Sequence, residues 1–358
     1  MDLKELFTGS KKLVGLDIGS SSLKLAEIVS TSQGPILNRF RQIPVPPGVI
    51  VDGVVEDAGA LSSIIKELFR NSGCKGKGIV TSLSGNSVIV KKVTLAQMEE
   101  VELRELIHDE AGKYLPFDNM DDVNYDFQIL GDNEYNPNQM DVIIVAAKKT
   151  DVNSYLDAIS AAGLTVMIMD VDSFALETMY EANYPFEDDE IIVIVNIGAK
   201  LTNISVIKGG MSIFTRDFTV AGNVITEGLQ EKYHVSADEA ERMKIEGMPA
   251  GDQGNIDFQN VILECADPIC SEIERSIDYF RSTFGGDYIK HVYLSGGSSR
   301  IVGLKNHLSQ RLNIETELIN PLLKIGYNKA NIDAGKLDSI KTIGAVAIGL
   351  GLRKIGDK

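Results

Sequence analysis

Two glycine turns, one in each half of the chain, carry the residues best suited to binding a phosphate chain. The first turn lies between two apolar runs in residues 13–25, where Asp17 precedes a glycine and three serines. The glycine permits a tight turn, and the serine amides can donate to phosphate oxygens. A lysine on the return run adds a point charge, and the aspartate can hold Mg²⁺ through water. The candidate nucleotide-binding residues of this turn are Asp17, Gly19, Ser20, Ser21, Ser22 and Lys24.

The second turn lies in residues 192–205 and repeats the same order of residue types, with Asn196 in the place of Asp17. These two residues are 179 positions apart, half of the 358-residue chain, which indicates a duplicated domain. Either turn alone is also explained by an ordinary β-hairpin. Two such turns that face each other, however, can hold one phosphate chain from both sides. The pair therefore predicts a nucleotide cleft between two similar halves.

Two further segments fit the remainder of a nucleotide. Residues 293–299 read YLSGGSS after a predicted strand, and the two glycines let a flat ring or a ribose approach the backbone. An ordinary loop between a strand and a helix explains them as well. On a predicted helix, Glu241 and Lys244 are three positions apart and share one face, which fits either ribose recognition or a surface ion pair.

Asp172 is the candidate catalytic residue, because a carboxylate just after the strand that we expect to end at Asp170 can orient an attacking water. The N-cap of a helix over residues 173–182 explains Asp172 equally well. The four histidines show no ligand spacing, so the sequence offers no Ser-His-Asp constellation. Cys74, Cys265 and Cys270 are too few and too scattered for a disulfide framework or a zinc site, and the last two read as ordinary helix residues.

A length of 358 residues exceeds the usual size of a single core, so two or more domains are expected. The composition, with 44% hydrophobic and 24% charged residues, is that of a folded protein. The formal charge of −16 argues against nonspecific binding to nucleic acid or to anionic lipid. Residues 1–12 lack the apolar core of a signal peptide, and no apolar run reaches the ~20 residues of a membrane helix. We therefore expect a cytoplasmic protein with no direct membrane span.

The elements that must position these residues follow an α/β order, with strands before helices in each half. In the first half we expect a helix between an N-cap at Asp57 and a stop at Gly73, and strands over 13–17, 23–29, 36–43, 78–82 and 164–170. In the second half we expect strands over 191–195, 203–207, 212–218, 290–294 and 315–318, and helices over about 223–232, 236–246, 256–284, 303–312 and 339–354.

Residues 86–165 read as an inserted β-α-β-β-α unit, a small sheet with helices on one face. Its strands are expected over 88–95, 123–130 and 141–147, with a polar loop between the last two, and its helices over 97–113 and 152–162. The predicted division has a first lobe of 1–85 with 166–184 and 335–358, an inserted subdomain of 86–165, a second lobe of 185–235 with 285–334, and a helical subdomain of 236–284. A hinge is expected over 183–189.

The motifs LDIGSSSLK, NIGAKLTNISV, AGNVIT, AERMK and LSGGSSRIVGL, in this order and spacing, resemble those of the actin-like ATPase superfamily. Within it, GLDIGSSSLKLAEI, IVDGVVED, DVDSFAL and IGAVAIGLGLR resemble the PilM family of type IV pilus assembly proteins, relatives of the division protein FtsA. The resemblance implies an α/β, duplicated actin-like (ribonuclease-H-like) ATPase fold. Its two lobes enclose a nucleotide cleft, and an FtsA/PilM-type subdomain is inserted.

The resemblance also implies the binding of ATP or ADP with Mg²⁺, the metal being held by Asp17 through water. By motif, the second phosphate site comprises Asn196, Gly198, Lys200 and Thr202, followed by Gly222 and Asn223. Glu241 and Lys244 would hold the ribose, and the adenosine site comprises Gly296, Gly297 and Ser298. The family usually has Asp at the position of Asn196, so we expect ATP hydrolysis to be weak or absent.

The partners implied by the family are the cytoplasmic N-terminal tail of a PilN-like inner-membrane protein and the pilus motor ATPases PilB and PilT. The protein would then be peripheral to the inner membrane through its partners, and homo-oligomerisation is left open. An FtsA-like division or filament-forming protein and a type II secretion adaptor of the same architecture are the alternative functions. A sugar or acid kinase of the superfamily would need a dedicated substrate base, which the sequence does not show.

Overall fold

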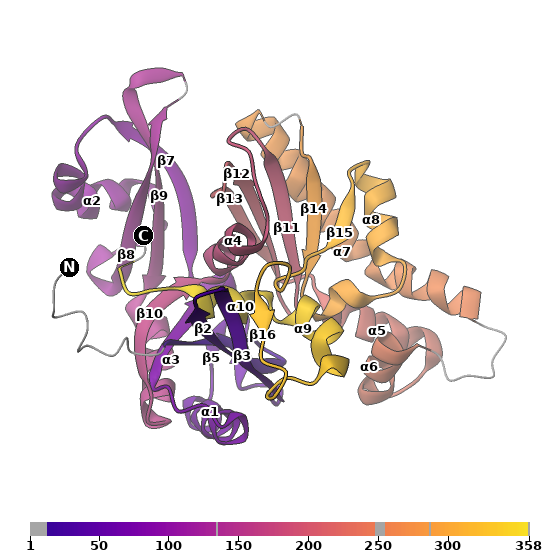
Figure 1. Ribbon diagram of the computed structural model, residues 1–358. Helices are drawn as coiled ribbons and strands as arrows, with labels where there is room; N and C mark the ends of the chain where they lie inside the picture. The colour runs from indigo at the N-terminus through magenta and orange to yellow at the C-terminus, as the bar shows by residue number, and fades with distance from the viewer. Residues whose placement is uncertain (1–12, 134, 248–254, 286–287, 357–358) are drawn as a thin grey trace.

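A computed structural model describes residues 13–133, 135–247, 255–285 and 288–356, and it contains two lobes, each with one large sheet (Figure 1). The sheet of the first lobe has the strand order β10-β6-β1-β2-β3-β16. Its strands are β1 (Leu13–Ile18), β2 (Ser22–Thr31), β3 (Gly34–Pro44), β6 (Gly78–Leu83), β10 (Thr165–Val171) and β16 (Gly326–Tyr327). The structure confirms the five strands expected here, and β16 is an addition from the second half of the chain.

The sheet of the second lobe has the order β13-β12-β11-β14-β15. Its strands are β11 (Ile191–Ile197), β12 (Thr202–Lys208), β13 (Met211–Phe218), β14 (His291–Ser295) and β15 (Thr316–Leu318). Helices α5 (Gly222–Tyr233), α7 (Asn255–Phe284) and α8 (Leu304–Leu312) contribute to the core on one face of this sheet, and α6 (Ala237–Glu246) packs on α5. The five strands expected in this half are confirmed, and so are its first four helices.

One hydrophobic core joins the two lobes. It includes Val80 of the first sheet and Ile194 of the second, together with side chains from α4 (Asp172–Asn183), α9 (Leu337–Ile343) and α10 (Ala345–Leu352). The expected single helix over 339–354 is therefore wrong in one respect, because the chain divides it at Gly344. The two sheets share this buried apolar volume, and each sheet has a core of its own on its other face.

The other face of the first sheet is covered by α1 (Ala58–Ser72) and α3 (Lys149–Ala161). Asp57 caps α1 as expected, since its Oδ1 accepts from Ala60 N at 2.8 Å, and Gly73 ends the helix with a φ of 65°. The short strands β4 (Ile50–Val51) and β5 (Val54–Val55), which the sequence did not indicate, form a hairpin beside α3. Tyr155 of α3 ties it down, because its hydroxyl donates to Gly53 O at 2.7 Å.

The inserted unit contains a three-stranded sheet of order β7-β9-β8. Its elements are β7 (Ile89–Ala96), α2 (Glu100–Tyr114), β8 (Val123–Asn133) and β9 (Asn136–Lys148). Two expectations are corrected here. The strands β8 and β9 run through most of the expected polar loop. The core of this sheet contains α2, whereas the buried side chains of α3 belong to the core of the first lobe, which of this sheet includes Ala147 of β9.

Four short 3₁₀ segments complete the described elements: η1 (Gly85–Ser87), η2 (Met120–Asp122), η3 (Gly297–Arg300) and η4 (Ala334–Lys336). None of the helices in the described part of the chain is both long and apolar enough to span a membrane. Cys265 and Cys270 lie on α7 as expected, and neither forms a disulfide. The predicted lack of a signal peptide concerns residues 1–12, which lie outside the described residues.

Candidate functional site

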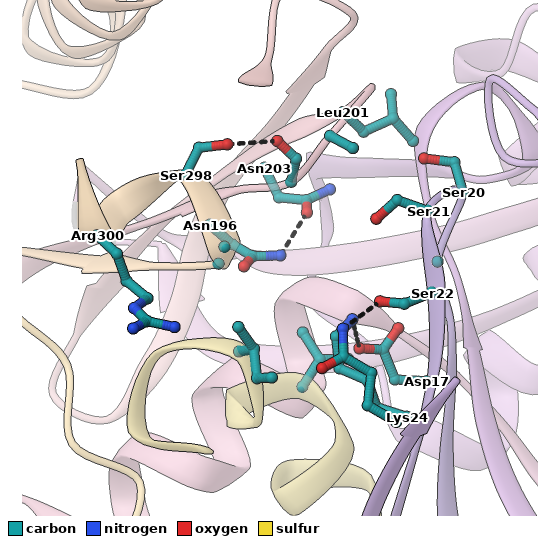
Figure 2. Close-up of a pocket in the computed structure, with 18 of the residues that line it drawn as sticks. Asp17, Ser20, Ser21, Ser22, Lys24, Asn196, Leu201, Asn203, Ser298 and Arg300 are labelled. Carbon is teal, nitrogen blue, oxygen red and sulfur yellow. Dashed lines mark hydrogen bonds and ion pairs between the residues drawn. The ribbon is translucent and has the colours of Figure 1, made fainter. Parts of the chain in front are cut away.

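A cavity of about 550 Å³ lies between the two lobes. Its wall includes residues of the β1–β2 and β11–β12 turns, of α6 and η3, and of α9 and α10. Figure 2 shows Ser20, Ser21 and Ser22 on one side of this cavity, and Asn196, Asn203 and Ser298 on the other. The volume falls within the roughly 300–1,000 Å³ that small-molecule sites usually occupy.

The two turns predicted from the sequence repeat are built alike. In the first hairpin Asp17 lies opposite Lys24, and in the second Asn196 lies opposite Asn203. The central strands are also equivalent, since β1 is parallel to β6 and β11 is parallel to β14. The structure therefore brings the two glycine turns together across one cavity, as two facing hairpins would require.

The first turn presents an ion pair at its base. Lys24 Nζ donates to Asp17 Oδ2 at 2.9 Å, and Asp17 is 7% exposed. Ser22 Oγ accepts from Gln42 Nε2 at 2.9 Å. All six predicted residues of this turn, from Asp17 to Lys24, lie on the cavity wall.

The second turn is held by the loops around it. Gly198 N donates to Leu201 O, and Gly198 O accepts from Gly222 N at 3.0 Å and from Ser298 Oγ at 3.2 Å. Gly222 must be a glycine here, since a Cβ would collide with Ser298 Oγ and with Gly198 O. Asn196 Nδ2 donates to Asn203 Oδ1 at 3.1 Å, so the two amides at the base of the turn are paired.

The remaining wall of the cavity comes from α6, η3 and the α9–α10 segment. Gly296, with a φ of 86°, leads into η3, and Gly297 and Ser298 follow it on the cavity wall. Figure 2 shows Arg300 on the same side, where its Nη1 lies 3.4 Å from Ser339 Oγ. Opposite charges from α6 also reach the wall, with Lys244 Nζ 2.6 Å from Glu241 Oε2.

Asp172 also reaches the cavity, as its candidate role requires. It is the first residue of α4, and the N-cap is Val171, which excludes the N-cap interpretation of Asp172. Ser82 Oγ donates to Asp172 Oδ1 at 2.5 Å. Loss of hydration, followed by the negative charge of Asp17, raises the pKa of Asp172 to about 7. A carboxyl group that titrates near neutral pH can accept or donate a proton under physiological conditions.

Four predicted residues do not form part of the cavity wall: Lys200, Thr202, Gly222 and Asn223. Thr202 is buried and its hydroxyl donates to Val220 O at 2.9 Å, while Asn223 N donates to Ala199 O at 2.8 Å. Thr202, Gly222 and Asn223 instead hold the second turn in place. Lys200 lies within this turn between Ala199 and Leu201, which both line the cavity.

Sequence reasoning missed several residues of the wall, among them Gln42, Ser84, Asn203 and Arg300. A signal existed for two of them. Asn203 follows Asn196 by the same seven positions that separate Lys24 from Asp17, and Arg300 directly follows the SGGSS segment. Gln42 and Ser84 come from distant strand ends, and no local pattern distinguishes them.

The described residues contain no group of three or more His, Cys, Asp or Glu that could hold a metal ion. A divalent ion at this site would therefore need oxygens from outside the protein. Phosphate and water supply such ligands to Mg²⁺ at many nucleotide sites.

Comparisons with known proteins identify both a family and a fold. The family described as "Type IV pilus assembly protein PilM" matches residues 15–355. A solved "PilM-PilN type IV pilus biogenesis complex" is 28% identical and has a TM-score of 0.84, covering 97% of this chain and 99% of that one.

Two more distant structures share the fold. The ethanolamine utilization protein EutJ from Carboxydothermus hydrogenoformans is 16% identical, with a TM-score of 0.55 and coverage of 95% of this chain and 88% of that one. MreB5 of Spiroplasma citri bound to AMPPNP is 13% identical, with a TM-score of 0.51 and coverage of 94% of each chain. These similarities confirm the predicted actin-like fold.

Proposed function

The chain belongs to the family of type IV pilus assembly protein PilM, and from this membership we propose that it is an ATP-binding adaptor of the inner-membrane complex that assembles type IV pili. In this proposal it binds ATP or ADP between its lobes. It also holds the cytoplasmic N-terminal tail of a PilN-like membrane protein, and so connects that protein to motor ATPases such as PilB and PilT.

The observation that carries nucleotide binding is the pair of facing turns on one cavity of about 550 Å³. Backbone amides of the serine turn and of the Gly198 turn are suited to phosphate oxygens. The solved MreB5 structure of the same fold was bound to AMPPNP, an ATP analogue. We place the phosphates between these two turns, the ribose at α6 and the adenosine beside η3.

The residues present also fit a Mg²⁺ ion that is held through water. Asp17 is the carboxylate at the base of the first turn, and its partner Lys24 can move to a phosphate oxygen when the nucleotide enters. Since no cluster of ligands exists among the described residues, the ion would be held by phosphate oxygens and water, with Asp17 contacting its water shell. Bound there, Mg²⁺ would neutralise phosphate charge.

Turnover is expected to be weak or absent. Asn196 occupies the base of the second turn, where an amide can hydrogen-bond but cannot carry negative charge. Asp172 lines the cavity and is the proposed catalytic residue, with the role of orienting a water. Binding can therefore persist while hydrolysis is slow, as suits a nucleotide-dependent adaptor.

Partner binding is supported by the solved PilM-PilN complex. The match to this chain covers 99% of a chain in that complex. We propose that the tail of a PilN-like protein binds in a groove near the inserted unit, and that the protein is cytoplasmic and attached to the inner membrane through this partner. Because the two lobes share a core, a movement of the lobes driven by nucleotide would change the shape of such a groove.

The test is a co-purification from solubilised inner membranes. The tagged full chain is prepared from cells with an intact PilN-like protein and from cells in which its cytoplasmic tail is removed. We expect the partner to be recovered only with its tail, and PilB or PilT to be enriched in the same fraction. A partner retained without its tail would contradict the tail assignment. Recovery of tubulin-like division proteins, or of filaments of this chain alone, would instead favour an FtsA-like function.

A further inference from the structure

The chain enters the inserted unit through residues 84–87, called here the entry segment. Ser84 lies on the wall of the cavity between the lobes, and β7 begins at Ile89. The remaining three residues of the entry segment form η1 (Gly85–Ser87). Because this one stretch of backbone joins the cavity wall to the inserted sheet, a movement of the wall at Ser84 also moves the start of β7.

The first lobe holds one side of the entry segment. Asn86 N donates to Asp52 O at 3.3 Å, and Ser87 Oγ donates to Gly53 O at 2.6 Å. Asp52 and Gly53 form the turn between β4 and β5. A Cβ on Gly53 would collide with Ser84 O, so the backbone of this turn lies directly against the entry segment.

The second lobe holds the other side of the entry segment. Gly85 N donates to Asp217 Oδ2 at 2.6 Å, and Asp217 lies near the end of β13. A Cβ on Gly85 would lie 2.7 Å from Cδ1 of Leu201, a residue of the second glycine turn that lines the cavity. Asp217 itself is not part of the cavity wall. Since the bond from Gly85 to Asp217 spans the two lobes, it forms only when they lie together.

The inserted unit also rests on the second lobe beyond its entry segment. β7 lies beside β13, although the two strands are edges of different sheets (Figure 1). Lys92 Nζ lies 2.8 Å from Asp141 Oδ2 within the inserted unit and 6.0 Å from the ring centroid of Phe284 on α7. A cavity of about 190 Å³ remains between them, with Val90 on one side and Phe214 on the other. The inserted unit has a core of its own, so this incompletely packed contact can loosen while the unit stays folded.

We propose that a nucleotide in the cavity clamps the inserted unit onto the second lobe through the hydrogen bond from Gly85 to Asp217. A phosphate chain held by both glycine turns favours the state in which the lobes lie together, and the bond requires this same state. Nucleotide binding and the bond therefore stabilise each other, and the coupling is reciprocal. The inference rests on the proposed function, because it takes the cavity to bind a nucleotide.

The test uses the full chain and the ATP analogue AMPPNP. Hydrogen exchange of residues 89–96 is measured with and without AMPPNP, and calorimetry gives the dissociation constant. Asp217→Ala removes the acceptor of Gly85 N, and Asp217→Asn is its matched control because an amide oxygen can still accept. In the unaltered protein, AMPPNP should slow exchange across β7 about tenfold. Asp217→Ala should abolish this slowing and weaken AMPPNP binding about tenfold, whereas Asp217→Asn should retain both properties.

The outcomes separate the clamp from the function beneath it. If AMPPNP binds to the unaltered protein without slowing exchange in residues 89–96, nucleotide does not clamp the inserted unit, although nucleotide binding stands. If Asp217→Ala retains the slowing, or binds AMPPNP as tightly as the unaltered protein, the bond to Gly85 does not carry the coupling. If the unaltered protein does not bind AMPPNP, the proposed nucleotide function fails, and the inference fails with it.

Discussion

Gly85 of the first lobe donates its backbone N–H to Asp217 of the second lobe, with 2.6 Å between N and Oδ2. Gly85 has a φ of 63°, and a Cβ there would lie 2.7 Å from Leu201 Cδ1. Leu201 belongs to the second glycine turn and lines the cavity. Since Gly85 begins the short segment that precedes β7, Leu201 of the second turn lies beside the chain that leads into the inserted unit.

The first prediction concerns this bridge between the lobes. Asp217→Ala leaves the Gly85 N–H without its acceptor and should lower the free energy of unfolding by about 1–3 kcal/mol. Asp217→Asn is the matched control, because its side-chain oxygen can still accept from Gly85. The measurement is denaturant unfolding of both proteins without nucleotide. If both variants lose the same free energy of unfolding, the charge of the Asp217 carboxylate stabilises the protein, and the hydrogen bond to Gly85 does not.

The second prediction is a pH dependence from Asp172. Its pKa is raised from an ordinary value of 3.8 to about 7, chiefly by burial and then by the charge of Asp17. Between these values the folded protein holds a proton that the unfolded chain has released, so this group makes the protein less stable as the pH rises through this window. Above about pH 7 the destabilisation is complete, and below the unfolded pKa it is absent.

Asp172→Asn removes this titration while keeping an acceptor for Ser82. The free energy of unfolding of the variant, relative to the unaltered protein, should therefore increase by at least about 1 kcal/mol between pH 4 and pH 8. Comparing the two proteins cancels the contribution of Glu177, whose pKa is raised to about 7 by burial and which both retain. A difference that stays constant across this range would show that Asp172 is ionised throughout in the folded state.

The sequence predicted those parts of the fold that depend on local pattern. The strands that contain Asp17 and Asn196, β1 and β11, run as apolar segments, and each is followed directly by a glycine, so both hairpins could be found. The cap at Asp57 and the stop at Gly73 were visible for the same reason. The packing of α3 could not be predicted from the sequence. Its apolar face is compatible with either of two neighbouring sheets, and only the tertiary structure selects the first lobe.

The candidate site was predictable to a similar extent. Gly198 of the second glycine turn and Ser298 of η3 both belong to patterns that are recognisable in a single segment. Thr226 on α5, whose hydroxyl donates to Glu241 Oε2 on α6 at 2.7 Å, was missed. This contact depends on the approach of α5 to α6, and nothing in the sequence of either helix indicates it. Lys244 was found, but spacing on one helix could not show that its ammonium group also donates to Thr226 and to Gly222 of α5.

The third prediction concerns the metal. Asp17→Asn should remove the contact with metal-bound water, so that ATP with Mg²⁺ binds about tenfold more weakly than in the unaltered protein. Affinity for ATP in excess chelator should be unchanged or higher, because a negative charge near the phosphates is gone. Calorimetry under both conditions measures this. Asp338→Asn, at an exposed ion pair with Lys341, is the control. Equal weakening with and without Mg²⁺ would rule out a metal-linked role for Asp17.

The fourth prediction concerns turnover. Asn196→Asp places a carboxylate at the base of the second turn, where the family usually has one, and it should raise ATP hydrolysis without much effect on ATP affinity. The change can be accommodated, since Asn203 can turn its amide so that its nitrogen donates to the new carboxylate. Phosphate release at saturating ATP measures turnover, and calorimetry measures affinity.

The matched control for this experiment is the double variant Asn196→Asp with Asp172→Asn. If Asp172 orients the attacking water, the gain from Asn196→Asp should be lost in the double variant while ATP still binds. Retained activity would assign the water to another residue. If phosphate release stays flat in the single variant as well, the amide at position 196 is not what limits hydrolysis.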